Sequence, residues 1–375
     1  MLRRLIGCLA AISLAMPGAA MASFSNMYVF GDSLSDSGNL YAWTGVKNNP
    51  VTGGTPIPVA PPYSPGRFQN GPSYAELLWE QMVQDGHLAQ SGKLTPSLLG
   101  GTNYAVGGAR SRYHNFDLQP GGLPPAADPS AFRAFSLLGQ LESYQARLGG
   151  SAADGNALYV VWGGSNDVQD VLTVAGTGDT KAAEARLTQA VADVADVIVS
   201  LVARGAREVL VPTVPDLGVV PAVRSKGALA ADAGTEYSRQ FNLALEAALA
   251  GLGATPGLHI VGYDAFGATQ EMFANPVGFG LADVDNPCLQ NFYVASKLDP
   301  NKPVGLCTNA AEHMFWDIVH PSARTHEILA QEMREAVPEP ATWLLVGLGF
   351  LGFGFGASRS RRAETARFAS VALAG

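Results

Sequence analysis

A serine, an aspartate and a histidine are the residues of this sequence best placed to do chemistry. Ser33 lies in Gly31-Asp32-Ser33-Leu34, directly after a short apolar run that predicts a β-strand. A serine hydroxyl is a weak nucleophile until a neighbouring base accepts its proton. His320 could be that base, because Asp317, three residues earlier, can turn back to orient its imidazole. These residue types point to nucleophilic acyl transfer.

Two other interpretations of these residues stay open at the level of sequence. Ser33 could instead be the N-cap of a following helix, a position that favours serine. His313, Asp317 and His320 could form a metal-binding face of a helix, although Pro321 disfavours a continuous helix there. We expect the remaining histidines to be structural, with His259 in the core and His87, His114 and His326 as solvated side chains.

Acyl transfer also needs hydrogen-bond donors for the negative charge on the tetrahedral intermediate. Gly107-Gly108 and Gly163–Asp167 both follow predicted strands, so they should lie at the same sheet edge as Ser33. Glycine lets backbone N–H groups approach a ligand closely, and the Asn166 amide supplies a side-chain donor.

Strand and helix patterns alternate along the chain and predict a parallel sheet flanked by helices. The predicted strands are Met27–Phe30, Thr102–Ala105, Ala157–Trp162, Glu208–Val214 and Leu258–Tyr263. The predicted helices are Ser73–Asp85, Phe135–Leu148, Lys181–Ala203, Ala228–Leu252 and Pro321–Ala336, the last with proline at its first position. Three long segments, Thr44–Gly71, Arg110–Ser130 and Phe266–His313, are expected to be binding loops or lids.

Four blocks in this order resemble the GDSL, or SGNH, family of serine esterases and lipases. They are Gly31–Leu34, Asn103–Ala109, Gly164–Asp167 and Asp317–His320, and Gly66–Gly71 resembles a segment of the lipase-like branch.

The resemblance implies a three-layer α/β/α, flavodoxin-like fold, with Ser33 as nucleophile and His320 as base oriented by Asp317. It also implies an oxyanion hole formed by the N–H groups of Ser33 and Gly108 and the side chain of Asn166. The double glycine leaves Gly107 as the other candidate donor, and the spacing from Asn103 favours Gly108. Neither a metal nor an organic cofactor is needed.

Composition narrows the possible functions of this 375-residue chain. Hydrophobic residues make up 47%, which excludes a wholly disordered chain. Charged residues make up only 15% and the net charge is −8, so a nucleic-acid partner is not expected. We assign residues 23–336 to one hydrolase domain.

Both ends of the chain are expected to be targeting segments. Residues 1–22 have the basic, apolar and small-residue regions of a secretory signal peptide. At the other end, residues 337–362 resemble a PEP-CTERM sorting signal: Pro-Glu-Pro, an uncharged span at 341–357, and an arginine cluster. That resemblance implies an exosortase-type processing enzyme, and residues 363–375 form a further tail. A plain membrane anchor is the alternative, since the uncharged span is long enough to cross a bilayer as a helix.

Export also bears on the cysteines, because an oxidising compartment favours a disulfide between Cys288 and Cys307. Two buried free thiols are the alternative.

The sequence therefore predicts an exported esterase or lipase that cleaves carboxylic esters through an acyl-enzyme on Ser33. The mature protein is expected in the periplasm, at the cell surface or outside the cell. Two alternatives are a deacetylase of extracellular polysaccharide and a non-catalytic surface-binding protein on the same scaffold.

Overall fold

A four-stranded parallel sheet organises the chain in the computed structural model, which describes residues 23–119 and 131–338. The strand order is β1 (Met27–Gly31), β2 (Leu158–Trp162), β3 (Glu208–Pro212) and β4 (His259–Tyr263). All five residues of β2 are buried, as expected for a strand that is covered on both faces. Gly31 pairs with Trp162, so the loops that follow β1 and β2 begin at the same level of the sheet.

The strand expected at Thr102–Ala105 is an extended segment beside β1 and not a full strand. The Val29 N–H donates to the Thr102 carbonyl (3.1 Å), and the Tyr104 N–H donates to the Val29 carbonyl (2.7 Å). The segment therefore continues the sheet beyond β1. Gly107-Gly108, which follow it, consequently lie close to the end of β1.

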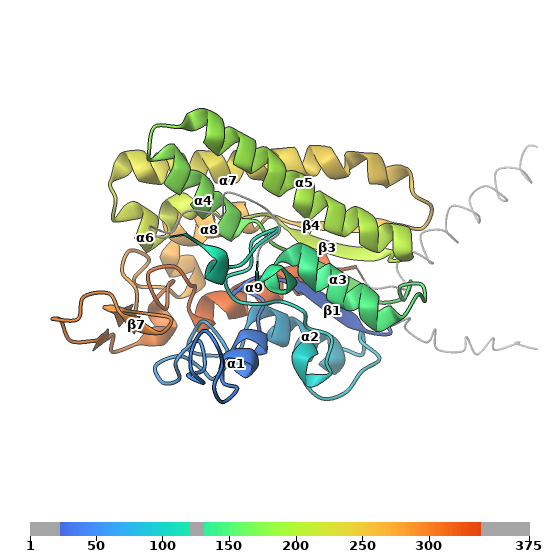
Figure 1. Cartoon of the computed structure of the whole chain (residues 1–375), viewed down its shortest axis with the longest axis horizontal. Coiled ribbons are helices and arrows are strands. Elements are labelled where there is room, and N and C mark those ends of the chain that lie inside the picture. The colour runs from blue at the N-terminus through green and yellow to red at the C-terminus, as the bar shows by residue number, and fades with distance from the viewer. Residues whose placement is uncertain (1–22, 120–130, 339–375) are drawn as a thin grey trace, which may run out of the picture. The chain divides into compact units, whose positions relative to one another are not determined.

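Helices cover both faces of the sheet, which confirms the three-layer α/β/α prediction (Figure 1). The helices α4, α5 and α7 pack together on one side, where α5 also contacts α3, and α2 packs against α9 on the other. Their bounds are α2 Tyr74–Gln84, α3 Leu137–Leu148, α4 Ser165–Ala175, α5 Thr180–Arg204, α7 Ala228–Leu249 and α9 Ala323–Ala336. The shorter helices are α1 Asn39–Thr44, α6 Pro221–Arg224 and α8 Ala265–Ala274.

Side-chain caps fix where two of these helices begin. At α2, Ser73 and Glu76 form a capping box. At α9 the Ser322 side chain accepts from the Thr325 N–H, so the helix begins at Ala323. The prediction that Pro321 is the first residue of this helix was wrong, because the serine that follows it takes the cap position.

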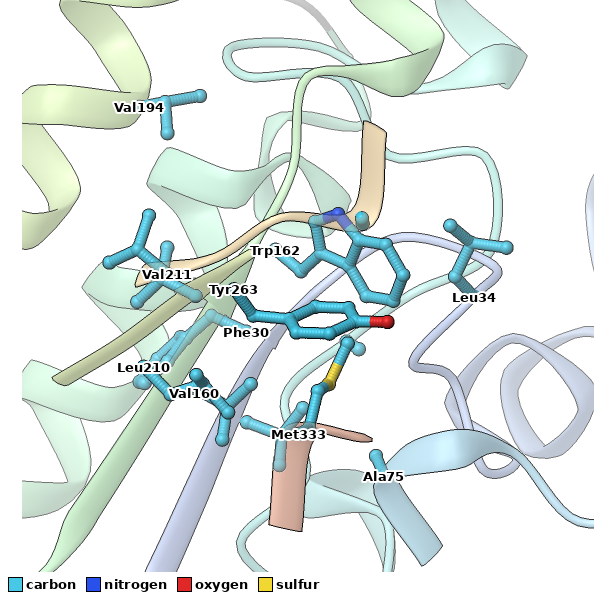
Figure 2. Packing of buried hydrophobic residues seen from close by; sticks show 14 of the residues in the cluster. Phe30, Leu34, Ala75, Val160, Trp162, Val194, Leu210, Val211, Tyr263 and Met333 are labelled. Atoms are coloured by element: carbon cyan, nitrogen blue, oxygen red, sulfur yellow. The ribbon is translucent and has the colours of Figure 1, made fainter. Parts of the chain in front are cut away.

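The main hydrophobic core lies between the sheet and its helices (Figure 2). Trp162 of β2, Tyr263 of β4 and Met333 of α9 belong to this cluster, as does Val194 of α5. Side chains from β2, β4, α5 and α9 thus share one core. This core anchors the ends of β1 and β2, from which the site described below is built.

The segment 266–313, expected to be a loop or lid, holds ordered structure of its own. It includes most of α8 and two small antiparallel sheets, of which one pairs β5 (Leu289–Gln290) with β8 (Gly305–Leu306) and the other pairs β6 (Phe292–Tyr293) with β7 (Ser296–Lys297). Cys288 and Cys307 form a disulfide that closes this part of the chain, which confirms the predicted pairing.

Within residues 23–119 and 131–338, no helix combines the length and the apolar character needed to cross a bilayer. The expected signal peptide, the uncharged span at 341–357 and the tail at 363–375 lie outside the described residues, as does part of the expected loop at 110–130.

Candidate active site

Ser33, His320 and Asp317 meet in a hydrogen-bonded chain at the carboxyl edge of the sheet. His320 Nε2 lies 3.0 Å from Ser33 Oγ, and His320 Nδ1 lies 2.7 Å from Asp317 Oδ2. All three residues are buried, and Ser33 retains 8% exposure. The distances confirm the expectation that these three residues, which are far apart in the sequence, lie within hydrogen-bonding reach of one another.

Asp317 is buried and accepts four hydrogen bonds. Its Oδ1 accepts from the N–H groups of Val319 and His320, at 2.7 Å each. Its Oδ2 accepts from His320 Nδ1 and from the Tyr63 hydroxyl, the latter at 2.5 Å. A carboxylate offers about four lone-pair sites, so its acceptor capacity is filled. The sequence predicted no role for Tyr63, which lies 254 positions from Asp317.

Aromatic rings enclose the His320 imidazole. The Phe68 ring centroid lies 5.1 Å from it, and Tyr293 stacks on it at 5.8 Å with an interplanar angle of 13°. Phe68 lies in the Gly66–Gly71 segment, whereas Tyr293 belongs to β6 of the disulfide-closed segment. Two long insertions, Thr44–Gly71 and Phe266–His313, are far apart in the sequence and thus both contact the imidazole.

Ser33 lies in a tight turn that two buried polar side chains hold to the sheet. Gln140 accepts from the Gly31 N–H (2.9 Å) and donates to the Gly31 carbonyl (2.8 Å). Asp36 accepts backbone N–H groups on both sides, from Gly38 (2.7 Å) and from Gly107 (2.8 Å). Burial raises the pKa of Asp36 to about 6. Because α1 begins only at Asn39, Ser33 is not a helix N-cap.

A hydrogen bond from Gly107 to Asp36 shows which of the two glycines has a backbone N–H left for a ligand. The Gly107 N–H is used by the Asp36 carboxylate. In the described part of the chain, the N–H groups of Gly108 and Ser33 have no hydrogen-bond partner. Gly108 has φ +82°, a conformation that favours glycine.

Asn166 is the third expected donor and lies in the first turn of α4. Its Nδ2 donates to the Ala109 carbonyl (2.9 Å) and, at 3.4 Å, approaches Asp32 Oδ2. The first contact joins α4 to the segment Asn103–Ala109, which we call the glycine block. Burial raises the pKa of Asp32 to about 6, and the backbone N–H of Leu34 opposes this rise.

A buried ion pair supports the glycine block from behind. Arg110 Nε and Nη2 donate to the two oxygens of Asp170, at 2.9 and 3.0 Å, and Nη1 donates to the Gly108 carbonyl (3.0 Å). Asp167 accepts from the Ser111 hydroxyl (2.7 Å) and backbone N–H. Burial raises the pKa of Asp167 to about 7.

A mainly apolar cavity of about 50 Å³ opens beside Ser33, Asn166 and His320. Most of the other side chains that line this cavity are apolar. They include Leu34, Leu217, Val220, Met314, Phe315 and Val319. The space beside Ser33 is therefore small and mainly apolar.

The expectations for the other histidines were wrong, because burial depends on distant parts of the fold. His87, His114 and His326 are buried and not solvated, whereas His259 on β4 is partly exposed and pairs with Glu208 (2.7 Å). His114 Nε2 lies 2.7 Å from the Gly107 carbonyl, and burial lowers the pKa of His114 to about 4. His114 thus supports the glycine block.

The alternative of a metal-binding helical face does not fit the structure. Residues 313–320 are not helical, and His313 Nδ1 faces the Asn286 carbonyl (3.2 Å). Within residues 23–119 and 131–338, no group of three or more His, Cys, Asp or Glu side chains is arranged to hold a metal ion.

An α/β sheet with serine, histidine and aspartate joined by hydrogen bonds at its carboxyl edge is an arrangement that serine hydrolases use. The profile of the GDSL-like lipase/acylhydrolase family matches residues 27–333, and the chain belongs to this family. The protein is accordingly a carboxylic-ester hydrolase. The profile of the PEP-CTERM protein-sorting motif matches residues 336–362.

Curated relatives support the family assignment over most of the chain. The sequence is 26% identical to a phosphatidylcholine-sterol acyltransferase of Aeromonas hydrophila, covering 82% of this chain and 89% of that one. It is 29% identical to the esterase EstA of Pseudomonas aeruginosa, over 92% of this chain but only 52% of that protein.

Among solved structures, the chain is similar to LAE5, an alpha/beta hydrolase from the Lake Arreo metagenome, with 13% identity and a TM-score of 0.42. The match covers 85% of this chain and 98% of LAE5. It is also similar to Axe2, an acetylxylan esterase from Geobacillus stearothermophilus, with 12% identity and a TM-score of 0.41, covering 85% of this chain and 96% of that one.

Proposed function

We propose that the protein hydrolyses acyl esters through a covalent acyl-enzyme on Ser33. The observation that carries this proposal is the continuous chain of contacts from Ser33 Oγ through His320 to Asp317. His320 Nε2 takes the hydroxyl proton as Oγ attacks the ester carbonyl, and Asp317 stabilises the imidazolium that forms. The tetrahedral intermediate collapses, and His320 gives the proton to the departing alcohol oxygen.

Water then completes the reaction at the same residues. His320 takes a proton from the water that attacks the acyl carbonyl, and this proton returns to Ser33 Oγ when the carboxylic acid leaves. One ester and one water thus give one acid and one alcohol, and the enzyme is regenerated. All the required proton transfers can pass through His320 Nε2.

The oxyanion in both steps would be held by the N–H groups of Ser33 and Gly108 and by Asn166 Nδ2, which would exchange its long 3.4 Å contact with Asp32 for the oxyanion. In support of this, the Gly107 N–H donates to Asp36, whereas the Gly108 N–H has no hydrogen-bond partner among the described residues. Such donors act best when they are preorganised and shielded from water. Arg110 and His114 hold the glycine block in place.

The acyl part of the substrate would be apolar. The cavity beside Ser33 is lined mainly by aliphatic and aromatic side chains, and its volume of about 50 Å³ suits the first carbons of an acyl chain. The similarity to a phosphatidylcholine-sterol acyltransferase agrees with an acyl chain donated by a lipid ester.

The PEP-CTERM match supports export and sorting to the cell surface. We infer that an exosortase-type enzyme processes the segment 337–362, and that residues 23–336 form the working domain. The membrane anchor is the alternative for the same segment. Mass spectrometry of the protein from native cells would separate them, because processing removes residues after the motif and an anchored form retains them.

A panel of esters tests the proposed activity. The full chain is assayed with p-nitrophenyl esters from acetate to palmitate, with phosphatidylcholine and with acetylated xylan, beside a Ser33→Ala control. We expect hydrolysis of the acyl esters, and a loss of at least ~10³ in kcat in the variant. Activity confined to the acetylated glycan, or equal rates in both proteins, would contradict the proposal.

A further inference from the structure

Tyr63 occupies a place at the candidate site that the Ser33–His320–Asp317 chain does not account for. Its hydroxyl lies 2.5 Å from Asp317 Oδ2, the oxygen that also faces His320 Nδ1. The ring is buried, with 2% exposure, and is not part of the surface that lines the substrate cavity. A tyrosine in this position can act on the reaction only through the aspartate.

The direction of this hydrogen bond follows from the other partner of Tyr63. The Val294 N–H donates to the tyrosine oxygen (2.9 Å), so the hydroxyl proton is directed to Asp317. Burial and the nearby carboxylate raise the pKa of Tyr63, so the phenol keeps this proton. Tyr63 is therefore a donor to the carboxylate.

Two insertions hold Tyr63 in position. Its ring packs against Trp316, the residue before Asp317, and against Phe292 of β6, with centroids 6.3 Å apart in each case. In Figure 1 the blue loops that follow α1 lie beside the orange segment that carries β7. A backbone hydrogen bond joins the two, from the Val59 N–H to the Val294 carbonyl (2.9 Å). The disulfide closes this second insertion.

We propose that Tyr63 is a positioning residue that completes a relay of Ser33, His320, Asp317 and Tyr63. Its hydroxyl fixes Oδ2 of Asp317 in line with Nδ1 of His320, so the carboxylate is in place when the imidazolium forms. The proposal rests on the function proposed above. It also gives the two insertions a task, because together they supply the hydroxyl and hold it.

A double-mutant cycle tests the relay. Tyr63→Phe removes only the hydroxyl, and we expect kcat to fall roughly 10- to 10²-fold, with KM within about twofold of the wild type. In an Asp317→Asn background the same change should lower kcat by less than about twofold, because the group through which Tyr63 acts is gone. An equal loss in both backgrounds, or an unchanged kcat in the single variant, would overturn the proposal.

Tyr263→Phe is the matched control. The Tyr263 hydroxyl also donates to a carboxylate, Glu332 Oε2, at 2.5 Å, but on the β4 side of the core. This variant should keep the wild-type kcat, so a comparable loss in both tyrosine variants would indicate a general effect on stability and overturn the relay.

A second series covers the case in which Tyr63→Phe does not fold. Fluorinated tyrosines at position 63 keep the ring and the hydroxyl but lower the phenol pKa stepwise. We expect kcat to vary with that pKa in the wild-type background and to stay flat with Asp317→Asn, and a flat response in both refutes the relay.

An active wild type with unimpaired Tyr63 variants refutes the relay alone, whereas an inactive wild type refutes the proposed function and the relay with it.

Discussion

Gly107→Ala is the substitution for which the structure predicts the most specific damage. A Cβ at this position would lie 2.0 Å from Phe68 Cζ and 2.2 Å from Cε2, whereas ordinary carbon contacts are about 3.5–4 Å. The buried Phe68 ring would have to move by about 1.5 Å. Overpacking of this kind costs about 1–3 kcal/mol of unfolding free energy.

The displaced ring also contacts the proposed base. Phe68 packs on His320 with centroids 5.1 Å apart, so we expect the imidazole to lose its alignment with Ser33. A misplacement of about 1 Å can cost 10²-fold in rate, and we predict a 10- to 10²-fold fall in kcat. The assay is p-nitrophenyl ester hydrolysis together with urea unfolding.

Gly251→Ala is the control, because a Cβ there meets nothing within 4 Å. Adding Phe68→Leu to Gly107→Ala should recover part of the lost stability, since a smaller side chain relieves the clash. A Gly107→Ala protein with wild-type kcat and wild-type unfolding free energy would refute this reasoning.

Three further predictions follow from the site and its supports. Asn166→Ala should lower kcat by about 10²–10³-fold through loss of an oxyanion donor, and unchanged steady-state rates would count against that role. Arg110→Ala should lower the unfolding free energy by about 3–5 kcal/mol, because it leaves Asp170 buried without its ion-pair partner; urea titration measures this. Burial raises the pKa of Asp167 to about 7, so between about pH 4 and pH 7 the folded state holds a proton that the unfolded state has released. Stability from this group is full below about pH 4 and is lost as the pH rises through 7, so Asp167→Asn should flatten the fall in unfolding free energy over that window.

The four strands of the main sheet and the meeting of Ser33 with His320 could be predicted from the sequence because their signals are local. Each motif directly follows an apolar run or immediately precedes a helix. The parallel arrangement then places the carboxyl ends of the strands at one edge. The strand ends were therefore enough to bring Ser33, Gly108 and Asn166 together, and His320 was placed by its position just before the last helix.

The supporting residues could not be predicted, because each depends on contacts between distant segments. Tyr63 and Asp317 are 254 positions apart, and His326 accepts a hydrogen bond from the Tyr74 N–H, 252 positions away. Polar residues such as His114 look solvated when only their neighbours in sequence are considered. Their burial becomes visible only when the loops are folded over the sheet.

Labelling with a fluorophosphonate tests the central claim most directly, because this reagent reacts much faster with a serine whose hydroxyl is activated by a base than with other residues. We predict one phosphonyl group on the peptide that contains Ser33 in the full chain, no labelling of Ser33→Ala, and much slower labelling of His320→Ala. A protein that hydrolyses esters but carries the label at another residue, or at none, would contradict the account.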